Sequence, residues 1–160
     1  MNKKKLVQIK SFNRDYVEDF YELNRKWIEE SWKLEISDIN DLTNPKKYII
    51  DNGGEIFFAM MNDQVIGTAA MVLSNGIFEL AKMTVIEECR GLGIANKLMD
   101  RCIEFAIYKK TEEIVLITNS ALVVARNLYD KYGFKEVKLD SDKYGERGDV
   151  KMVLKLSAVK

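Results

Sequence analysis

A strand-like segment, ELAKMTV at residues 79–85, leads directly into the glycine-containing segment IEECRGLGIA at residues 86–95. Apolar residues then recur at Leu98, Cys102 and Phe105, a spacing typical of an amphipathic helix. The first N–H groups of such a helix have no internal partner and lie at the positive end of its dipole. Because glycine lets the backbone approach a ligand closely, the segment predicts a phosphate or pyrophosphate site.

The glycine spacing alone leaves other interpretations open. Gly91-x-Gly93-x-x-Asn96 partly matches a dinucleotide fingerprint, and two glycines can also form a simple tight turn. A dinucleotide site normally follows the first strand of a parallel sheet and has a third small residue where this chain has Asn96. A P-loop is excluded, because the sequence contains no Gly-Lys-Ser or Gly-Lys-Thr.

The flanking pattern predicts one α/β domain over residues 1–160, without repeats or linkers. Turn signals at Asn62-Asp63 and at residues 74–76 favour an antiparallel meander. The later strand, helix, strand order implies a right-handed crossover and a parallel pair. Strands are predicted at residues 5–12, 55–61, 65–73, 77–85, 114–118, 134–139 and 150–156. Helices are predicted over residues 15–32, from Asn44 to the Asn52-Gly53-Gly54 stop, after Gly93, and over residues 122–132.

Composition excludes several functional classes. The 25 basic and 25 acidic residues balance, which argues against a general affinity for nucleic acid. The longest apolar run, at residues 56–61, is far short of the ~20 residues that cross a bilayer. The absence of histidine removes Ser-His-Asp catalysis and HExxH metal sites, and Cys89 and Cys102 form no CxxC. We therefore expect a cytoplasmic protein with no metal and no membrane or nucleic-acid partner.

Two sequence motifs resemble those of the GNAT acetyltransferases. RGLGIA at residues 90–95 is similar to the family's Arg/Gln-x-x-Gly-x-Gly/Ala signature, and ARNLYDKYGF at residues 125–134 is similar to its A-x-x-LY-x-K-x-GF segment. The preceding strand lies in the family's usual place, and the resemblance covers nearly the whole chain. It implies a GNAT fold, a mixed sheet of about six to seven strands with about four helices and a splayed parallel strand pair.

The resemblance implies that acetyl-CoA is the co-substrate and that an amine attacks it directly in a ternary complex. The pantetheine arm would lie in the gap between the splayed strands. Many relatives have asparagine where this chain has Leu122, so the cofactor assignment passes to the upstream Asn119. The residues implied to hold the coenzyme are Met83, Thr84 and Val85 on the strand, Arg90, Gly91, Leu92, Gly93, Ile94 and Ala95 in the loop, and Asn119.

Two residues are implied to be catalytic. Glu79 would accept the ammonium proton, directly or through water, and Tyr129 would protonate the departing thiolate. A backbone N–H, that of Met83, would polarise the carbonyl. Plainer interpretations stay open, since Glu79 can be a solvated carboxylate and Tyr129 a core aromatic residue. A covalent route through Cys89 is disfavoured, because no histidine is present to activate the thiol.

The charge pattern bears on the acceptor. Residues 15–41 contain nine acidic and three basic residues, which predicts that a small cationic amine is drawn to this part of the chain. A solvated acidic helix face explains the same pattern. Two other functions remain open: a non-catalytic acyl-CoA sensor, and an enzyme that acetylates a macromolecular amine such as a protein N-terminus or an aminoacyl-tRNA. A homodimer is also left open.

Overall fold

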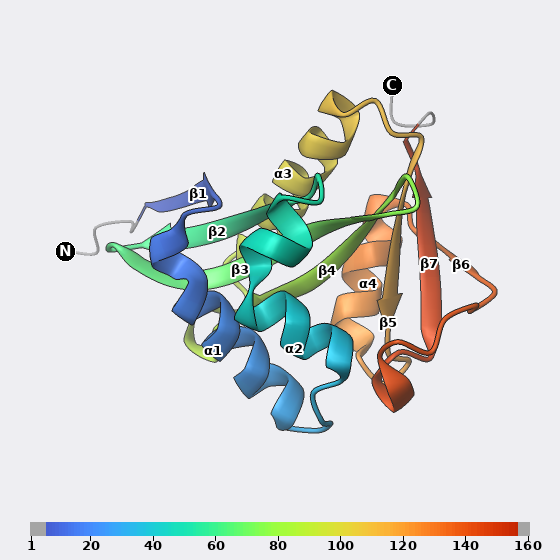
Figure 1. Ribbon diagram of the computed structural model, residues 1–160, viewed down its shortest axis with the longest axis horizontal. Coiled ribbons are helices and arrows are strands. Elements are labelled where there is room, and N and C mark those ends of the chain that lie inside the picture. The colour runs from blue at the N-terminus through green and yellow to red at the C-terminus, as the bar shows by residue number, and fades with distance from the viewer. Residues whose placement is uncertain (1–5, 157–160) are drawn as a thin grey trace.

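The computed structural model describes residues 6–156 and contains one mixed sheet between two layers of helices (Figure 1). Residues 1–5 and 157–160 of the predicted domain, including Lys5 of the first predicted strand, lie outside the described part. The strands are β1 (Val7–Ser11), β2 (Glu55–Met61), β3 (Gln64–Ser74), β4 (Ile77–Val85), β5 (Glu113–Thr118), β6 (Lys135–Val137) and β7 (Val150–Lys155). The α-helices are α1 (Val17–Glu29), α2 (Ile36–Thr43), α3 (Ile94–Tyr108) and α4 (Val123–Tyr132).

The sheet has the strand order β1-β2-β3-β4-β5-β7-β6. Strand β1 pairs antiparallel with β2, and strands β2, β3 and β4 form the predicted antiparallel meander. Its tight turns are formed by Asn62 and Asp63, with φ of 53° and 61°, and by Asn75 and Gly76, with φ of 51° and 77°. Positive φ at both central residues gives a turn whose twist matches that of the flanking strands. The two predicted turns are therefore confirmed.

The predicted crossover is also confirmed, because β4 and β5 are parallel and α3 connects them. Their pairing stops where Leu80 lies opposite Leu116. Beyond that point β4 stays paired with β3 as far as Val85, and β5 stays paired with β7 as far as Thr118. The two strands therefore separate toward their carboxyl ends, as expected of a splayed pair.

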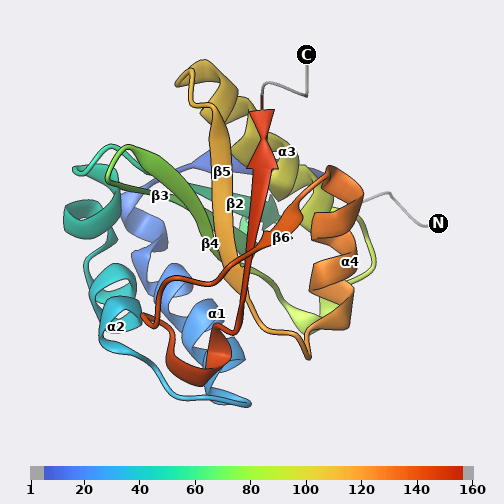
Figure 2. The ribbon, with the colours of Figure 1, turned by 90° about the vertical axis from the view of Figure 1, so that its right-hand side faces the viewer.

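Each face of the sheet has its own apolar core. Helices α1 and α2 cover one face, and α3 and α4 cover the other (Figure 2). Phe20 and Leu42 fill the first core together with Phe58, and all three are fully buried. The second core includes Leu98 and Cys102 on α3. Burial on both faces explains why the central strands read as nearly continuous apolar runs.

The helical piece predicted to begin at Asn44 is present but short: a π-helical turn, Lys46–Ile50, follows Pro45 and ends before the predicted stop at Asn52-Gly53-Gly54. Asn44 also ends the preceding helix, α2. The Asn44 side chain does cap this turn, accepting a hydrogen bond from Lys47 N at 3.3 Å. Helix α2 was not predicted because its sequence, ISDINDLT, is rich in residues of low helix propensity. Tertiary contacts of Asp38 and Leu42, both fully buried, stabilise it instead.

Three smaller helical turns complete the chain: η1 (Arg14–Tyr16), η3 (Glu87–Cys89) and η4 (Gly145–Arg147). Strand β6 is shorter than the predicted 134–139 and pairs only with β7. The segment between β6 and β7 crosses the carboxyl end of the sheet to reach α2, where Ser37 Oγ donates a hydrogen bond to Lys143 O (Figure 2). Across residues 6–156, no helix combines the length and apolar character that crossing a membrane requires.

Candidate active site

A cleft of about 760 Å³ opens where β4 and β5 separate. Its lining combines the end of β4, the loop before α3, the end of β5, part of α4 and the segment around η4. Leu92 lies outside the lining and is 63% exposed. The other residues that the sequence assigned to the site all lie in the lining: Glu79, Met83, Thr84, Val85, Arg90, Gly91, Gly93, Ile94, Ala95, Asn119 and Tyr129.

The loop before α3 requires two glycines. Gly91 and Gly93 have φ of 82° and 79°, in the left-handed region that residues with a side chain rarely adopt. A Cβ atom on either glycine would meet no described atom within 4 Å. Backbone shape, rather than packing inside the protein, therefore demands glycine here. The space above the loop is open to a ligand.

The start of α3 offers free hydrogen-bond donors. Gly93 is its N-cap residue, and within residues 6–156 no side chain caps its first turn. The helical hydrogen bonds begin with Lys97 N, which donates to Gly93 O at 3.2 Å. Earlier N–H groups and the helix dipole are thus available to an anion. Arg90 lies beside them, with its Nε donating to Val85 O at 3.1 Å. These features fit a pyrophosphate.

The separated strands fit an extended arm leading from that pyrophosphate. Met83, Thr84 and Val85 line the cleft from β4, and Thr118 and Asn119 line it from the end of β5. An extended chain can add to such unpaired strand edges through backbone hydrogen bonds. Asn119 itself is partly committed, because its Nδ2 donates to Glu146 O at 3.1 Å and its Oδ1 accepts from Ala121 N at 2.8 Å.

A bulge in β4 turns one lysine into the cleft. The register with β3 passes from Ala70 opposite Ala81 to Thr68 opposite Thr84, which leaves an extra residue on β4. Lys82 lies at this point, with φ of 54°. A bulge re-aims a side chain and interrupts the ladder. It places the Lys82 side chain among the lining residues, although that side chain is only 3% exposed.

Two neighbouring side chains bind the carboxylate of Glu79. Its Oε2 accepts a hydrogen bond from Tyr144 Oη at 2.6 Å, and its Oε1 pairs with Lys143 Nζ. Burial raises the pKa of Tyr144 well above 10, and the charge of Glu79 raises it further, so the phenol stays protonated. Each carboxylate oxygen has two lone-pair directions, so Glu79 can still accept a proton from the cleft.

Tyr129 lies in the cleft wall on α4 and packs against Phe134, with ring centroids 5.9 Å apart. Burial raises its pKa to about 12. A phenol with this pKa is protonated throughout the neutral range. It can donate a hydrogen bond into the cleft, and it is a weak acid.

A buried charge cluster adjoins the cleft. Asp38, on α2, is fully buried and accepts hydrogen bonds from Lys82 Nζ at 2.6 Å and from both terminal nitrogens of Arg147 at 2.7 and 2.9 Å. Burial raises the pKa of Asp38, but its hydrogen bond from Arg147 and the charge of Lys82 outweigh this and hold it below 3.8. Lys82 and Arg147 both line the cleft.

Sequence reasoning missed this cluster and Tyr144. The partners are 44 and 109 residues apart in the chain, so no local spacing connects them. One signal was available, because Lys82 interrupts the otherwise uncharged run LAKMTV of a buried strand. A charge in a buried strand needs a partner or a function.

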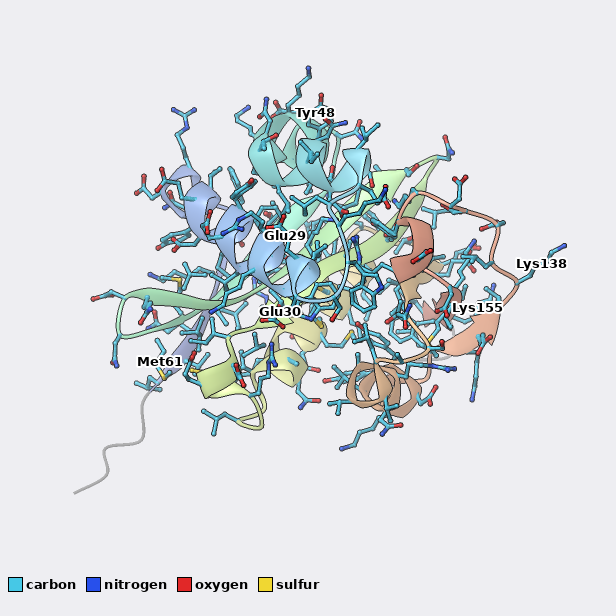
Figure 3. The ribbon with its side chains drawn as sticks, turned by 90° about the horizontal axis from the view of Figure 1, so that it is seen from below. Glu29, Glu30, Tyr48, Met61, Lys138 and Lys155 are labelled. Carbon is cyan, nitrogen blue, oxygen red and sulfur yellow. The ribbon has the colours of Figure 1, made fainter. Side chains whose placement is uncertain are left out.

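The acidic residues of segment 15–41 do not line the main cleft. Asp38 lies behind the two cations, and Glu22 and Glu29 each pair with an arginine of the same helix. Glu29 and Glu30 lie at the C-terminal end of α1 (Figure 3). Glu22 and Glu30 line a separate cleft of about 200 Å³. The cationic acceptor stays a prediction, and the acidic residues it rests on lie outside the main cleft.

Comparisons with known proteins point to one family. A family model described as an acetyltransferase (GNAT) domain matches residues 15–156. The N-acetylaspartate synthetase of Xenopus tropicalis is 32% identical over 107 residues, which cover 65% of this chain and 40% of that protein. The chain thus spans about two fifths of the length of this curated relative.

Solved structures share the fold. A GNAT-family acetyltransferase from Staphylococcus aureus Mu50 superimposes with a TM-score of 0.84 at 25% identity, covering 94% of this chain and 99% of that one. The PaiA N-acetyltransferase from Thermoplasma acidophilum, solved in complex with coenzyme A, gives a TM-score of 0.72 at 18% identity, covering 94% and 99%. The mixed sheet with its splayed parallel pair is therefore shared with these structures.

Proposed function

The chain belongs to the GNAT acetyltransferases, and from this premise we propose that it transfers the acetyl group of acetyl-CoA to a primary amine by direct attack in a ternary complex. The observation that carries the proposal is the splayed β4–β5 pair opening onto the uncapped start of α3. The names of the Xenopus relative and of the PaiA structure both state N-acetylation, which supports an amine acceptor.

The chain's own groups would hold acetyl-CoA in two places. The N–H groups around Gly91 and Gly93, with Arg90, would bind the pyrophosphate. The backbone of Met83 and Val85 would bind the pantetheine arm in the gap between β4 and β5. When bound, acetyl-CoA supplies a thioester whose acetyl carbon passes to the acceptor nitrogen while the sulfur leaves as the coenzyme A thiol.

Glu79 would be the general base. An ammonium must lose a proton before its nitrogen can attack, and a Glu79 oxygen facing the cleft can take that proton. The hydrogen bond from Tyr144 at 2.6 Å fixes the orientation of the carboxylate. Tyr144 is therefore a positioning residue, and it was not foreseen in the sequence.

Tyr129 would stabilise the departing sulfur. Burial raises its pKa to about 12, so the phenol is protonated throughout the neutral range. Its Oη can therefore donate a hydrogen bond to the departing sulfur. The Met83 N–H would donate to the thioester carbonyl oxygen.

Acetyl-CoA binding is the first test. Saturation at about one hundred times the dissociation constant should stabilise the fold by about 2.7 kcal/mol, seen as a rise in Tm. Gly93→Asp should remove this rise, because the substitution brings a negative charge to the pyrophosphate site and strains a left-handed backbone position. A matched control is Gly76→Asp, which strains the β3–β4 hairpin outside the cleft and should keep the rise.

Thiol release then separates catalysis from sensing. A panel of amines with acetyl-CoA should release coenzyme A thiol in proportion to the acetylated product. A protein that shows the Tm rise but releases no thiol with any amine is a sensor and contradicts acetyl transfer. A protein that shows no Tm rise with acetyl-CoA or coenzyme A contradicts the proposal as a whole.

A further inference from the structure

Asp38 has no capacity left for the cations that contact it. Oδ1 accepts from Lys82 Nζ and from one terminal nitrogen of Arg147. Oδ2 accepts from the other terminal nitrogen and from Glu35 N at 2.9 Å. Two donors on each oxygen saturate a carboxylate. The further N–H groups of the two cations therefore need an acceptor other than Asp38.

Lys82 and Arg147 are nonetheless buried, with side chains 3% and 9% exposed. Within residues 6–156 they donate the three hydrogen bonds to Asp38 and no others. An ammonium has three N–H donors and a guanidinium has five, so most of their donors stay free. Both side chains line the cleft, where those donors can reach a ligand.

The charge of this cluster is unbalanced on the side of the cleft. Two cations face one carboxylate, and Asp38 lies behind them rather than in the lining. Asp41 is nearby and its charge acts on Lys82, but burial raises the pKa of Asp41, and it forms no ion pair with either cation among the described residues. Burial also lowers the pKa of Lys82, and the charges of Asp38 and Asp41 oppose this effect. Buried cations are costly without a full complement of anions. An anionic group from the cleft would complete the cluster.

Tyr144 links this cluster to the general base. Its hydroxyl binds Glu79, while Lys82 Nζ and Arg147 Cζ lie 4.9 and 4.8 Å from the centre of its ring. One tyrosine side chain therefore separates the group that takes the amine proton from the groups that need an anion. An acceptor that meets both must carry its amine and its anion close together.

We propose that the acceptor is an amino acid, with its amine facing Glu79 and its carboxylate held by Lys82 and Arg147. The proposal rests on the proposed acetyl transfer and names the substrate class of the same cleft. A carboxylate fits better than a larger anion because a planar pair of oxygens matches the remaining N–H groups of a guanidinium. Glu79 would bind the ammonium before it takes its proton.

The test compares each of several amino acids with its methyl ester and with the amine that lacks the carboxyl group. Thiol release from acetyl-CoA is measured for each. kcat/KM should fall by at least about 100-fold for the ester and for the amine, because the buried cations lose their charged partner. The ester is the sharper control, because its amine deprotonates more readily than that of the free amino acid. A lower kcat/KM for the ester therefore cannot come from slower deprotonation.

A variant pair locates the effect. Lys82→Met keeps the length of the side chain, and Asp38 keeps its two hydrogen bonds from Arg147. KM for the amino acid should rise by about 10- to 100-fold, and the difference in kcat/KM between the amino acid and its methyl ester should narrow. The control is Lys151→Met, which removes the ion pair with Asp140 on β7 outside the cleft and should leave both values unchanged.

A binding measurement without turnover completes the design. An N-acetyl amino acid should bind the coenzyme A complex in calorimetry, and its methyl amide should not. Equal kcat/KM for amino acid and ester, or a polyamine as best acceptor, would overturn the amino acid proposal and leave acetyl transfer standing. Failure of the coenzyme-dependent Tm rise overturns the proposed function instead. If coenzyme A binds but no amine is acetylated, the calorimetry still tests whether Lys82 and Arg147 bind a carboxylate.

Discussion

In the proposed reaction Glu79 takes a proton that the solvent takes unaided at high pH. Glu79→Gln keeps an oxygen that can accept from Tyr144 Oη, so the local structure should persist. We expect kcat/KM at neutral pH to fall by about 10² to 10⁴, with partial recovery as the pH approaches the pKa of the amine. Pre-steady-state and steady-state rates from pH 6 to 10 measure this.

Tyr144→Phe tests whether the Tyr144 hydroxyl positions Glu79. It removes the hydrogen bond to Glu79 but leaves the carboxylate and the ring beside the cations. The shape of the pH profile should shift while the activity is only partly lost. If Glu79→Gln and the unchanged protein show the same pH profile, the proton goes to another group.

Tyr129→Phe tests stabilisation of the sulfur. Because the Tyr129 pKa is raised to about 12 by burial, the phenol acts as a hydrogen-bond donor, and kcat should fall by about 10- to 100-fold. KM for acetyl-CoA should change little. Tyr108→Phe is the control, since Tyr108 is 80% exposed and lies outside the lining of the cleft. An unchanged kcat in Tyr129→Phe would leave Tyr129 as a packing partner of Phe134.

The residues that would hold the coenzyme could be predicted because most of them are neighbours in the sequence as well as in the cleft. Arg90 to Ala95 form a loop and the first residues of α3, and Glu79 to Val85 belong to one strand. The charge cluster of Asp38, Lys82 and Arg147 could not be predicted, because folding brings these residues together from three distant segments. The acidic excess of segment 15–41 still predicts a cationic acceptor, but its acidic residues lie outside the lining of the main cleft.

Strand β4 depends on a buried polar chain at its bulge. Asn24 Nδ2 donates to Thr68 Oγ1 at 3.1 Å, and Thr68 Oγ1 donates to Lys82 O at 2.8 Å. Thr68→Val keeps the volume of the side chain but leaves the Asn24 amide and the Lys82 carbonyl without this partner. The free energy of unfolding should fall by about 1–3 kcal/mol. Urea denaturation at pH 7 measures the loss.

The same substitution reports on function through Lys82. Loss of the Thr68 hydrogen bond should loosen the left-handed Lys82 backbone and weaken acceptor binding more than coenzyme binding. Thr43→Val is the control, because its hydroxyl bonds Ile39 O on the exposed end of α2 and should cost far less. A Thr68→Val protein as stable as the unchanged one would show that the bulge is held by the strand ladder alone.

Elements with a local signal were predicted well, and those without one were not. The meander has its turn residues, and α4 ends at Gly133 with φ of 98° as expected. Helix α2 has weak propensity and is stabilised through Asp38, which only the folded chain pairs with Lys82. All three residues of strand β6 are exposed, so no burial extends it beyond Val137.

At the scale of the whole molecule, Asp38 joins α2, β4 and η4. Asp38→Asn would leave Lys82 and Arg147 buried without their anion, at a cost of about 3–5 kcal/mol in the free energy of unfolding. Urea denaturation at pH 7 should show this loss. Asp51→Asn, which breaks the exposed pair with Lys46, is the control and should change stability by less than about 1 kcal/mol.

The pH dependence has a definite sign. The Asp38 pKa lies below its ordinary value of 3.8 because Arg147 and Lys82 outweigh the effect of burial. A carboxyl with a lowered pKa stabilises the fold above its unfolded pKa, and this contribution is lost as the pH falls through its folded pKa. Acid denaturation of the unchanged protein should therefore steepen below about pH 4, and Asp38→Asn should flatten it. Parallel acid curves for both proteins would contradict the assignment.

Strand β7 follows β6 in the chain yet lies between β5 and β6 in the sheet. A ribosome delivers the chain from its N-terminus, so β4, the glycine loop, α3 and β5 exist before Val150–Lys155 can pair with them. Until then one edge of β5 is bare and open to misplaced pairing. Tyr144 and Arg147 reach their positions only with the docking of β7, which follows them directly. The order of synthesis thus imposes an order of assembly. The glycine loop and the strands beside it can form during translation, whereas the part of the cleft that contains Tyr144 and Arg147 forms last.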